Sequence, residues 1–294
     1  MSHDAIRRLW NRIESIHTNE GPMWTASMRA DLALAVGLGI PTLFMAWQIV
    51  TLDGPLAHGQ DWRNLTNAGQ LLLSGANPYT EPLFRWNPLI GYAFAAISGA
   101  PYWLWIAAHV AVLFALPTPA RWIALISWPF WFDVLVGNVM ALVFMLAWHA
   151  LDGKRWAVIG FILAALLIPR PLMLPVLTWL LWKQPWSRWW FVGLALVVGA
   201  GTLATGWTAE YLNRLAEIDW RYLVAWGPFY PLMLALAAWL TWKGRLGLAS
   251  LAASPYLIVN YLLMLVLEVS TRPARSSAPT PRSTNSPTSL SPSR

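Results

Sequence analysis

The chain has 294 residues, of which 57% are hydrophobic and only 11% are charged. Soluble domains carry about 25% charged residues, so this composition is typical of an integral membrane protein. The net charge of +7 comes from basic residues in short connections between apolar segments, which favours contact with anionic lipid over nucleic acid. The lack of cysteine excludes disulfides, thiolate catalysis and zinc–thiolate sites.

The amino-terminal segment, residues 1–30, has an amphipathic pattern. Ile6, Leu9 and Ile13 recur at helical spacing, and Arg7 and Arg8 occupy the remaining surface. Such a helix lies in a membrane interface rather than across it. We expect it on the cytoplasmic face.

Residues 31–268 form the predicted transmembrane domain, an all-α polytopic bundle of about nine helices. The apolar segments cover residues 32–52, 101–117, 120–135, 138–152, 155–169, 171–183, 187–207, 229–243 and 247–268. A spanning helix takes about 20 residues, so several of these segments are short. We see no internal repeat along them.

Basic residues set the expected direction of threading. Arg121, Lys154, Lys183 and Lys243 fall in alternate connections, which the positive-inside rule assigns to the cytoplasm. The opposite connections, 53–100, 136–138, 169–171 and 205–228, are then outside. Within the outer loop 53–100, residues 65–73 and 87–97 are too short to span and predict outer-face juxtamembrane helices. The Ser/Pro/Arg-rich tail, residues 269–294, is expected to be disordered, and its side stays open.

This threading brings the unusual polar residues to one face. Asp61 and Arg63 lie in the first outer loop, and Asp133 and Asn138 flank the next outer turn. Arg170 stands between Pro169 and Pro171, a pair that ends one helix and starts another. An anionic lipid headgroup is a suitable partner for this arginine, because guanidinium matches phosphate geometry.

Each residue also has an ordinary interpretation, as a solvated acid, an interfacial arginine or a helix cap. The sequence contains no cluster of metal ligands, no phosphate-binding glycine loop and no Ser/His/Asp order. The argument for a site therefore depends on the polar residues coming together.

An ordered set of motifs resembles a known enzyme family. The set comprises Asp61, Ala68, Gly75, Pro78-Tyr79, Phe84-Arg-Trp-Asn-Pro88, Gly137-Asn-Val-Met-Ala-Leu, Lys154-Arg155 and Gly160-Phe-Ile-Leu-Ala-Ala-Leu-Leu-Ile-Pro169. Over residues 30–245 this order is similar to the polyprenyl-phosphate-mannose-dependent mannosyltransferases of glycosyltransferase family 87. The chain departs from the family at Asn138, Leu65 and Ile168, where members commonly have Gln, an aromatic residue and Lys. A shortened or divergent member is therefore an open alternative.

The resemblance implies the membrane-integral GT-C fold, in a multi-pass protein of the cell membrane, with a bacterial inner membrane expected. It implies transfer of a hexose, with mannose as the expected sugar, from a polyprenyl-phosphate donor to an outer-face glycolipid or glycan acceptor. Asp61 matches the general base, and Arg170 is the candidate for binding the donor phosphate. The candidate substrate-binding residues are Arg63, Tyr79, Asp133 and Asn138.

The scheme implied by the resemblance requires no cofactor, metal or nucleic acid, and membrane lipids are the other expected partners. The alternative is a non-catalytic lipid-binding or lipid-moving membrane protein on the same scaffold. A transporter is disfavoured because no inverted repeat is visible.

Overall fold

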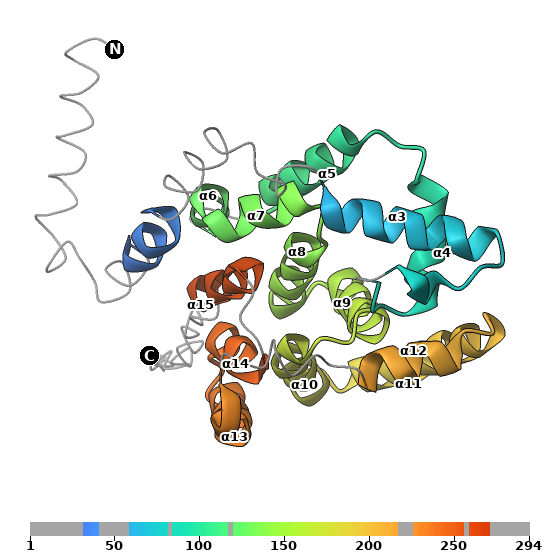
Figure 1. Cartoon of the computed structure of the whole chain (residues 1–294). Helices are drawn as coiled ribbons and strands as arrows, with labels where there is room; N and C mark the ends of the chain where they lie inside the picture. Colours follow the sequence, from blue (N-terminus) through green and yellow to red (C-terminus); the bar gives the residue numbers. More distant parts are fainter. Residues whose placement is uncertain are drawn as a thin grey trace, which may run out of the picture.

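The computed structural model describes residues 32–40, 59–81, 84–116, 120–216, 226–255 and 259–270. These residues form helices, short 3-10 segments and connecting turns, without a β-strand among them (Figure 1). The all-α prediction is thereby confirmed. The predicted amphipathic segment 1–30 lies outside the described residues, as does the tail beyond residue 270.

A helix over residues 32–40 comes first. The remaining elements, in chain order, are α3 (Gln60–Leu73), η2 (Pro78–Thr80), α4 (Pro88–Ile97), α5 (Tyr102–Phe114), α6 (Ala120–Ile126), α7 (Trp128–Val136), α8 (Met140–Leu151), α9 (Arg155–Leu167), η3 (Pro171–Met173), α10 (Leu174–Lys183), α11 (Trp186–Ala204), α12 (Thr208–Ala216), η5 (Gly227–Phe229), α13 (Tyr230–Trp242), α14 (Leu246–Ala253), η6 (Val259–Val266) and α15 (Leu267–Ser270).

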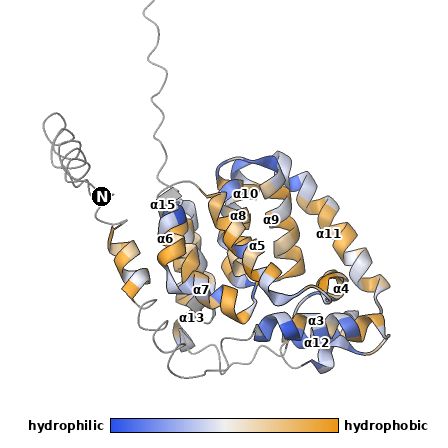
Figure 2. Ribbon diagram, turned by 90° about the horizontal axis from the view of Figure 1, so that it is seen from above, coloured by the Kyte–Doolittle hydropathy of each residue, from blue (hydrophilic) through white to orange (hydrophobic). Residues whose placement is uncertain are grey.

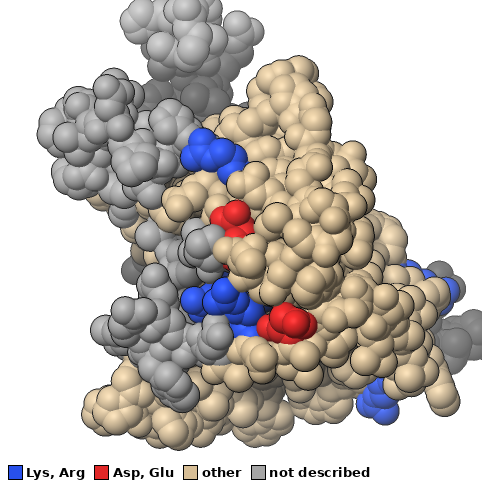
Figure 3. Space-filling view, turned by 45° about the vertical axis from the view of Figure 1, so that its right-hand side comes forward, with Lys and Arg blue, Asp and Glu red and all other residues tan. Residues whose placement is uncertain are grey.

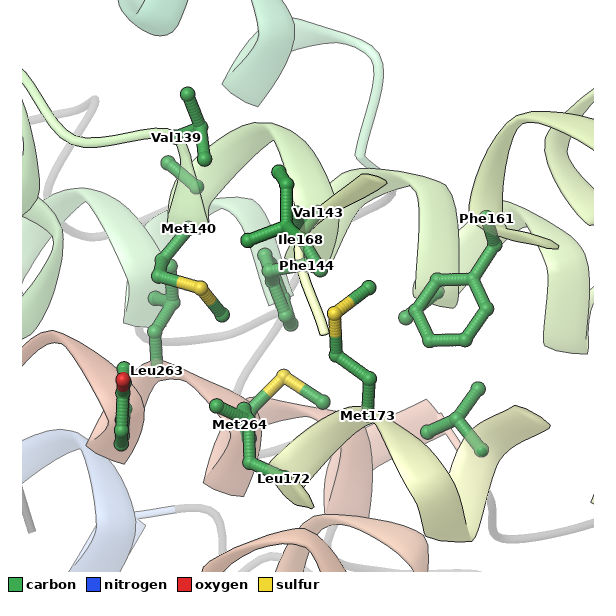
Figure 4. Packing of buried hydrophobic residues seen from close by; sticks show 14 of the residues in the cluster. Val139, Met140, Val143, Phe144, Phe161, Ile168, Leu172, Met173, Leu263 and Met264 are labelled. Carbon is green, nitrogen blue, oxygen red and sulfur yellow. The ribbon is translucent and has the colours of Figure 1, made fainter. Parts of the chain in front are cut away.

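Helices α8, α9 and α10 occupy the centre of the molecule, between the α3–α4 pair and the α13–α14 pair (Figure 1). The core beneath α8 brings Phe144, Met173 and Met264 together from α8, η3 and η6 (Figure 4). All three side chains are at most 1% exposed. This packing holds α8 against η3, the short segment that follows the end of α9.

Most predicted apolar segments coincide with one helix, but two of them are broken, and residues 41–52 of the first segment lie outside the described residues. The segment 120–135 divides into α6 and α7 at Ser127, just before Trp128-Pro129, and the segment 247–268 breaks after Ala253, next to Pro255. Proline removes a backbone donor and disfavours helical geometry in the residue before it, so a continuous helix ends there. The predicted juxtamembrane helices at 65–73 and 87–97 correspond to α3 and α4.

Among the described residues, α11 combines 19 residues with enough hydropathy to cross a bilayer alone. Helices α4 and α5 reach that standard only as a pair, and they are bent by 110° at their junction. The prediction of about nine transmembrane helices therefore stays a prediction.

Hydropathy separates two helices from the others. Helices α3 and α12 are largely hydrophilic, whereas α8, α9 and α11 are predominantly hydrophobic (Figure 2). The polar helix α3 carries Asp61, which thus lies in the first turn of a helix and not in an irregular loop.

Candidate functional site

The turn between α7 and α8 lies directly against the start of α3. Gly137 ends α7 with a φ of 77°, a left-handed conformation that favours glycine. A Cβ added at Gly137 would lie 2.6 Å from the Cβ of Trp62, closer than real atoms approach. A second tie joins the same regions, because the Gly59 N–H donates to the Leu135 carbonyl at 3.0 Å. The missing side chain of Gly137 therefore lets the α7–α8 turn meet α3.

This approach places Asn138 on Asp61. The Asn138 Nδ2 donates to the Asp61 Oδ2 at 2.6 Å, across 77 positions of sequence. The Asn138 Oδ1 accepts from the Val139 N–H at 2.7 Å, which orients the amide. Two residues that the sequence placed in separate outer connections thus form one contact.

Opposing influences act on the ionisation of the Asp61 carboxyl. Burial raises the pKa of the Asp61 carboxyl above its ordinary value, and this is the largest effect. The hydrogen bond from Asn138 and the positive charge of Arg170 act in the opposite direction. The carboxylate is therefore partly desolvated and lies within electrostatic reach of a guanidinium, a combination that marks a candidate functional site.

Arg170 occupies the break between α9 and α10. Helix α9 ends at Leu167, and Arg170 itself is extended, with φ −113° and ψ 128°, before η3 begins at Pro171. Its side chain is half-buried. The prediction that the proline pair ends one helix and starts another is confirmed. The break places the Arg170 guanidinium within electrostatic reach of Asp61.

Asp133 lies behind this contact and supports the turn. Its side chain is fully buried, and its Oδ2 accepts from the Ala141 N–H at 2.7 Å in the first turn of α8. The same oxygen lies 3.8 Å from Nε2 of His109, whose ring also contacts the carbonyl oxygen of Asn138 at 2.9 Å. Asp133 therefore holds the backbone that carries Asn138.

Arg63 lies near the Asp61–Asn138 contact, because its charge and that of Asp61 both act on Tyr102, whereas Tyr79 lies apart from it. The Arg63 side chain, which follows the buried Trp62 in α3, is exposed. Tyr79 follows the far end of α3, which is about 20 Å long. Its buried hydroxyl donates to the Trp86 carbonyl at 3.0 Å, and its carbonyl accepts from Arg214 Nη2 at 2.5 Å. The structure thus assigns Tyr79 a packing and anchoring role beside α12.

Two residues that shape the site were absent from the sequence candidates. His109 contacts the Asn138 carbonyl of the α7–α8 turn at 2.9 Å, and this contact comes only from tertiary packing. Trp62 stacks near Trp105 at 4.9 Å and forms the wall against which Gly137 packs. Its neighbour Asp61 is the one sequence signal that pointed to it.

On the face that Figure 3 presents, basic and acidic side chains lie close together near the centre, and most of the remaining described surface is uncharged. Among the described residues, no group of three or more His, Cys, Asp or Glu residues could hold a metal ion.

Comparison with known proteins gives one partial likeness. No family model and no solved structure matches the chain. Eighty-four residues are 34% identical to the lipoprotein signal peptidase of Lactococcus lactis subsp. lactis (strain IL1403), which is 27% of this chain and 47% of that protein. The chain thus spans about half the length of the curated relative it matches, and the likeness to family 87 mannosyltransferases stays a prediction.

Proposed function

We propose that the chain is a multi-pass membrane glycosyltransferase that uses a polyprenyl-phosphate sugar as its donor. The sugar is a hexose, with mannose expected, and the acceptor is a glycolipid or glycan at the outer face of the cell membrane. The observation that carries this proposal is a half-buried Asp61 carboxylate that accepts a hydrogen bond from Asn138 and lies within electrostatic reach of the Arg170 guanidinium, at a break between two helices.

The two groups suit the two ends of a glycosyl transfer. The acceptor oxygen attacks the anomeric carbon while its proton passes to the Asp61 carboxylate. The bond between the anomeric carbon and the phosphate oxygen breaks, and the electron pair stays on the leaving polyprenyl phosphate. Arg170 stabilises the charge that grows on this phosphate, and Asn138 orients the base.

A membrane setting is supported by the composition, by the long apolar helix α11 and by the hydrophobic outer surface of the bundle. A lipid-linked donor would reach the site from within the bilayer. The break at Arg170 interrupts the helical hydrogen bonds, which a bilayer tolerates where protein covers the backbone, and here the Asn87 N–H donates to the Leu167 carbonyl at 3.1 Å.

The central experiment is Asp61→Asn in membranes supplied with labelled polyprenyl-phosphate sugar. Loss of the base is expected to lower transfer by about 10²–10⁴-fold. Folding should persist, because burial already disfavours the charged form of this carboxyl. The matched control is Asp152→Asn, a change at an exposed carboxyl beyond the opposite end of α8, which should leave transfer unchanged. Equal transfer by the Asp61→Asn variant and the parent would refute the assignment of the base.

Arg170→Ala tests the other end of the reaction. Because the guanidinium is assigned to the donor phosphate, this change should raise the KM for the donor more than the KM for the acceptor. Arg188→Ala is the control, since Arg188 is exposed and its Nε donates to the Leu181 carbonyl. An equal effect on both substrates would remove the proposed role of Arg170.

The second candidate function is a lipid-binding or lipid-moving protein without catalysis. The contact that favours it is the short Asn138–Asp61 hydrogen bond, which occupies one carboxylate oxygen and could serve only to hold α3 on the α7–α8 turn. In that case the parent would bind polyprenyl phosphate without transferring sugar, and Asp61→Asn would bind it equally well.

A further inference from the structure

Two helices end in the same sequence pattern. Trp-Leu-x-Trp-Lys closes α10 from Trp179 and closes α13 from Trp239. The likeness extends back to Pro-Leu-Met-Leu, which stands at residues 171–174 and again at 231–234. The expectation of a chain without internal repeats is therefore wrong over these two short segments. The repeat was missed because it covers the length of one helix and not half of the helix bundle.

In both copies the lysine folds over the two indoles that precede it. The Lys183 Nζ lies 5.0 Å from the ring centroid of Trp179 and 4.1 Å from that of Trp182. In the second copy Lys243 repeats this geometry, at 6.0 and 4.3 Å from its two indoles. Each ammonium is thus held by cation–π contacts on one side.

The two lysine-bearing ends are neighbours. Helices α10 and α13 pack against each other. A Cβ added at Gly244, the residue after Lys243, would lie 3.3 Å from the ring of Trp179. The carboxyl ends of the two helices, which carry the two lysines, are therefore close together.

Among the described residues, the side chains at these two helix ends are largely exposed. Both lysines are exposed, and Trp182, Trp239 and Trp242 are 46%, 52% and 60% exposed. Within the part of the chain that the structure describes, neither ammonium lies within ion-pair distance of a carboxylate. A lysine at a helix carboxyl end complements the helix dipole, which accounts for the charge but not for the exposed indoles beside it.

The adjoining start of α11 continues the same chemistry. Trp189 is 81% exposed next to Arg188, and the Arg155 guanidinium lies 5.7 Å from the ring of Trp186. Indole prefers the headgroup zone of a bilayer, and basic side chains there attract anionic lipid.

We infer that the paired ends of α10 and α13 form a docking surface for anionic phospholipid headgroups. The phosphodiester of the lipid accepts hydrogen bonds from the outward side of each ammonium, while the indoles lie along the glycerol region. The surface is separate from the Asp61 site, so the inference does not depend on the proposed reaction.

The test uses the full chain purified in a neutral detergent and titrated in parallel with phosphatidylglycerol and phosphatidylcholine. Native mass spectrometry counts the lipids bound. The parent should retain phosphatidylglycerol in preference to phosphatidylcholine. The double variant Lys183→Gln/Lys243→Gln should lose affinity for phosphatidylglycerol by about fivefold for each lysine, the effect of one basic residue near an anionic surface.

Three further variants make the result decisive. Lys183→Arg/Lys243→Arg keeps both charges and should keep phosphatidylglycerol. Lys154→Gln removes a lysine that already lies 3.9 Å from the Asp152 carboxylate, so binding should be unchanged. Asp61→Asn should also bind normally, which separates this surface from the transfer reaction. Equal binding of the two lipids by the parent, or an equal loss in the Lys154→Gln variant, would overturn the inference.

Discussion

At the scale of single residues, Asp61 is held between opposing influences. Burial raises the pKa of its carboxyl, while Asn138 and Arg170 lower it. The carboxylate must be ionised to accept a proton, so activity should fall as the pH drops through its pKa in the folded protein. The position of that acid limb therefore reports the environment of Asp61 directly.

Replacing the amide donor gives a prediction of definite sign. In the Asn138→Leu variant the carboxylate loses its hydrogen bond, so the pKa of Asp61 rises further and the acid limb of the transfer rate moves to higher pH. A pH profile of donor-dependent transfer measures the shift. Asn67→Leu changes an exposed residue of α3, the helix that carries Asp61, and should leave the pH profile unchanged. An acid limb that stays fixed in Asn138→Leu would show that another group sets it.

Gly137 carries a second prediction, about stability. Gly137→Ala forces a Cβ to within 2.6 Å of Trp62 and imposes a left-handed φ on alanine. The left-handed conformation alone costs of order 1–3 kcal/mol, and the clash adds to it. The control is Gly153→Ala, which has the same conformational cost at a φ of 82° but open space around the added Cβ. Thermal unfolding should show the larger loss for Gly137→Ala, and equal losses would deny the close approach of the turn to α3.

At the scale of elements, hydropathy predicts the apolar helices well wherever proline is absent, but it misses the hydrophilic helix α12 inside the predicted connection 205–228. The segments 138–152 and 155–169 differ from α8 and α9 by two residues at most. Pro129 and Pro255 are visible in the sequence, but each lies within a long apolar segment that was predicted as one helix, so the two breaks were not predicted. The Asp61–Asn138 contact lay beyond sequence reasoning, because it depends on how closely one turn approaches a distant helix.

Asn87 shows how the polar side of the bundle is held together. Its Oδ1 caps α4 by accepting from the Leu89 N–H at 3.0 Å, and its Nδ2 donates to the Thr202 Oγ1 of α11 at 2.7 Å. A side-chain hydrogen bond from Asn87 also lowers the pKa of Tyr211 in α12, against the larger effect of burial, which raises it. One buried amide thus connects three helices.

Thr202→Val tests this connection with little change in shape. The variant removes the acceptor of the Asn87 amide inside the protein, so it should cost about 1–3 kcal/mol of stability. Thr241→Val is the matched control, because among the described residues the Thr241 hydroxyl bonds the Ala237 carbonyl of its own helix and no other helix. The midpoint of chemical denaturation should be clearly lower for Thr202→Val than for Thr241→Val. Indistinguishable midpoints would show that the Asn87–Thr202 hydrogen bond does not stabilise the fold.

At the scale of the whole molecule, the proposed reaction and the lipid surface require opposite faces. Helix α8 has 12 residues and is about 18 Å long, with the Asn138 turn before its start and Asp152 just past its end. The chain contains no cysteine, so single cysteines can report each face without background. We expect an impermeant maleimide to label Asn67→Cys and Thr80→Cys on intact cells.

Asp152→Cys should react only after the membrane is opened, because its side chain, 63% exposed, lies at the basic end that the positive-inside rule places in the cytoplasm. Labelling of Asn67→Cys and Thr80→Cys on intact cells would place the α3 side outside. Protection of Asp152→Cys in intact cells, with reactivity in opened ones, would place the paired ends of α10 and α13 inside. Labelling of all three cysteines from one side would mean that the bundle does not separate the two faces. An outer-face donor site and an inner-leaflet lipid surface could not then belong to the same molecule.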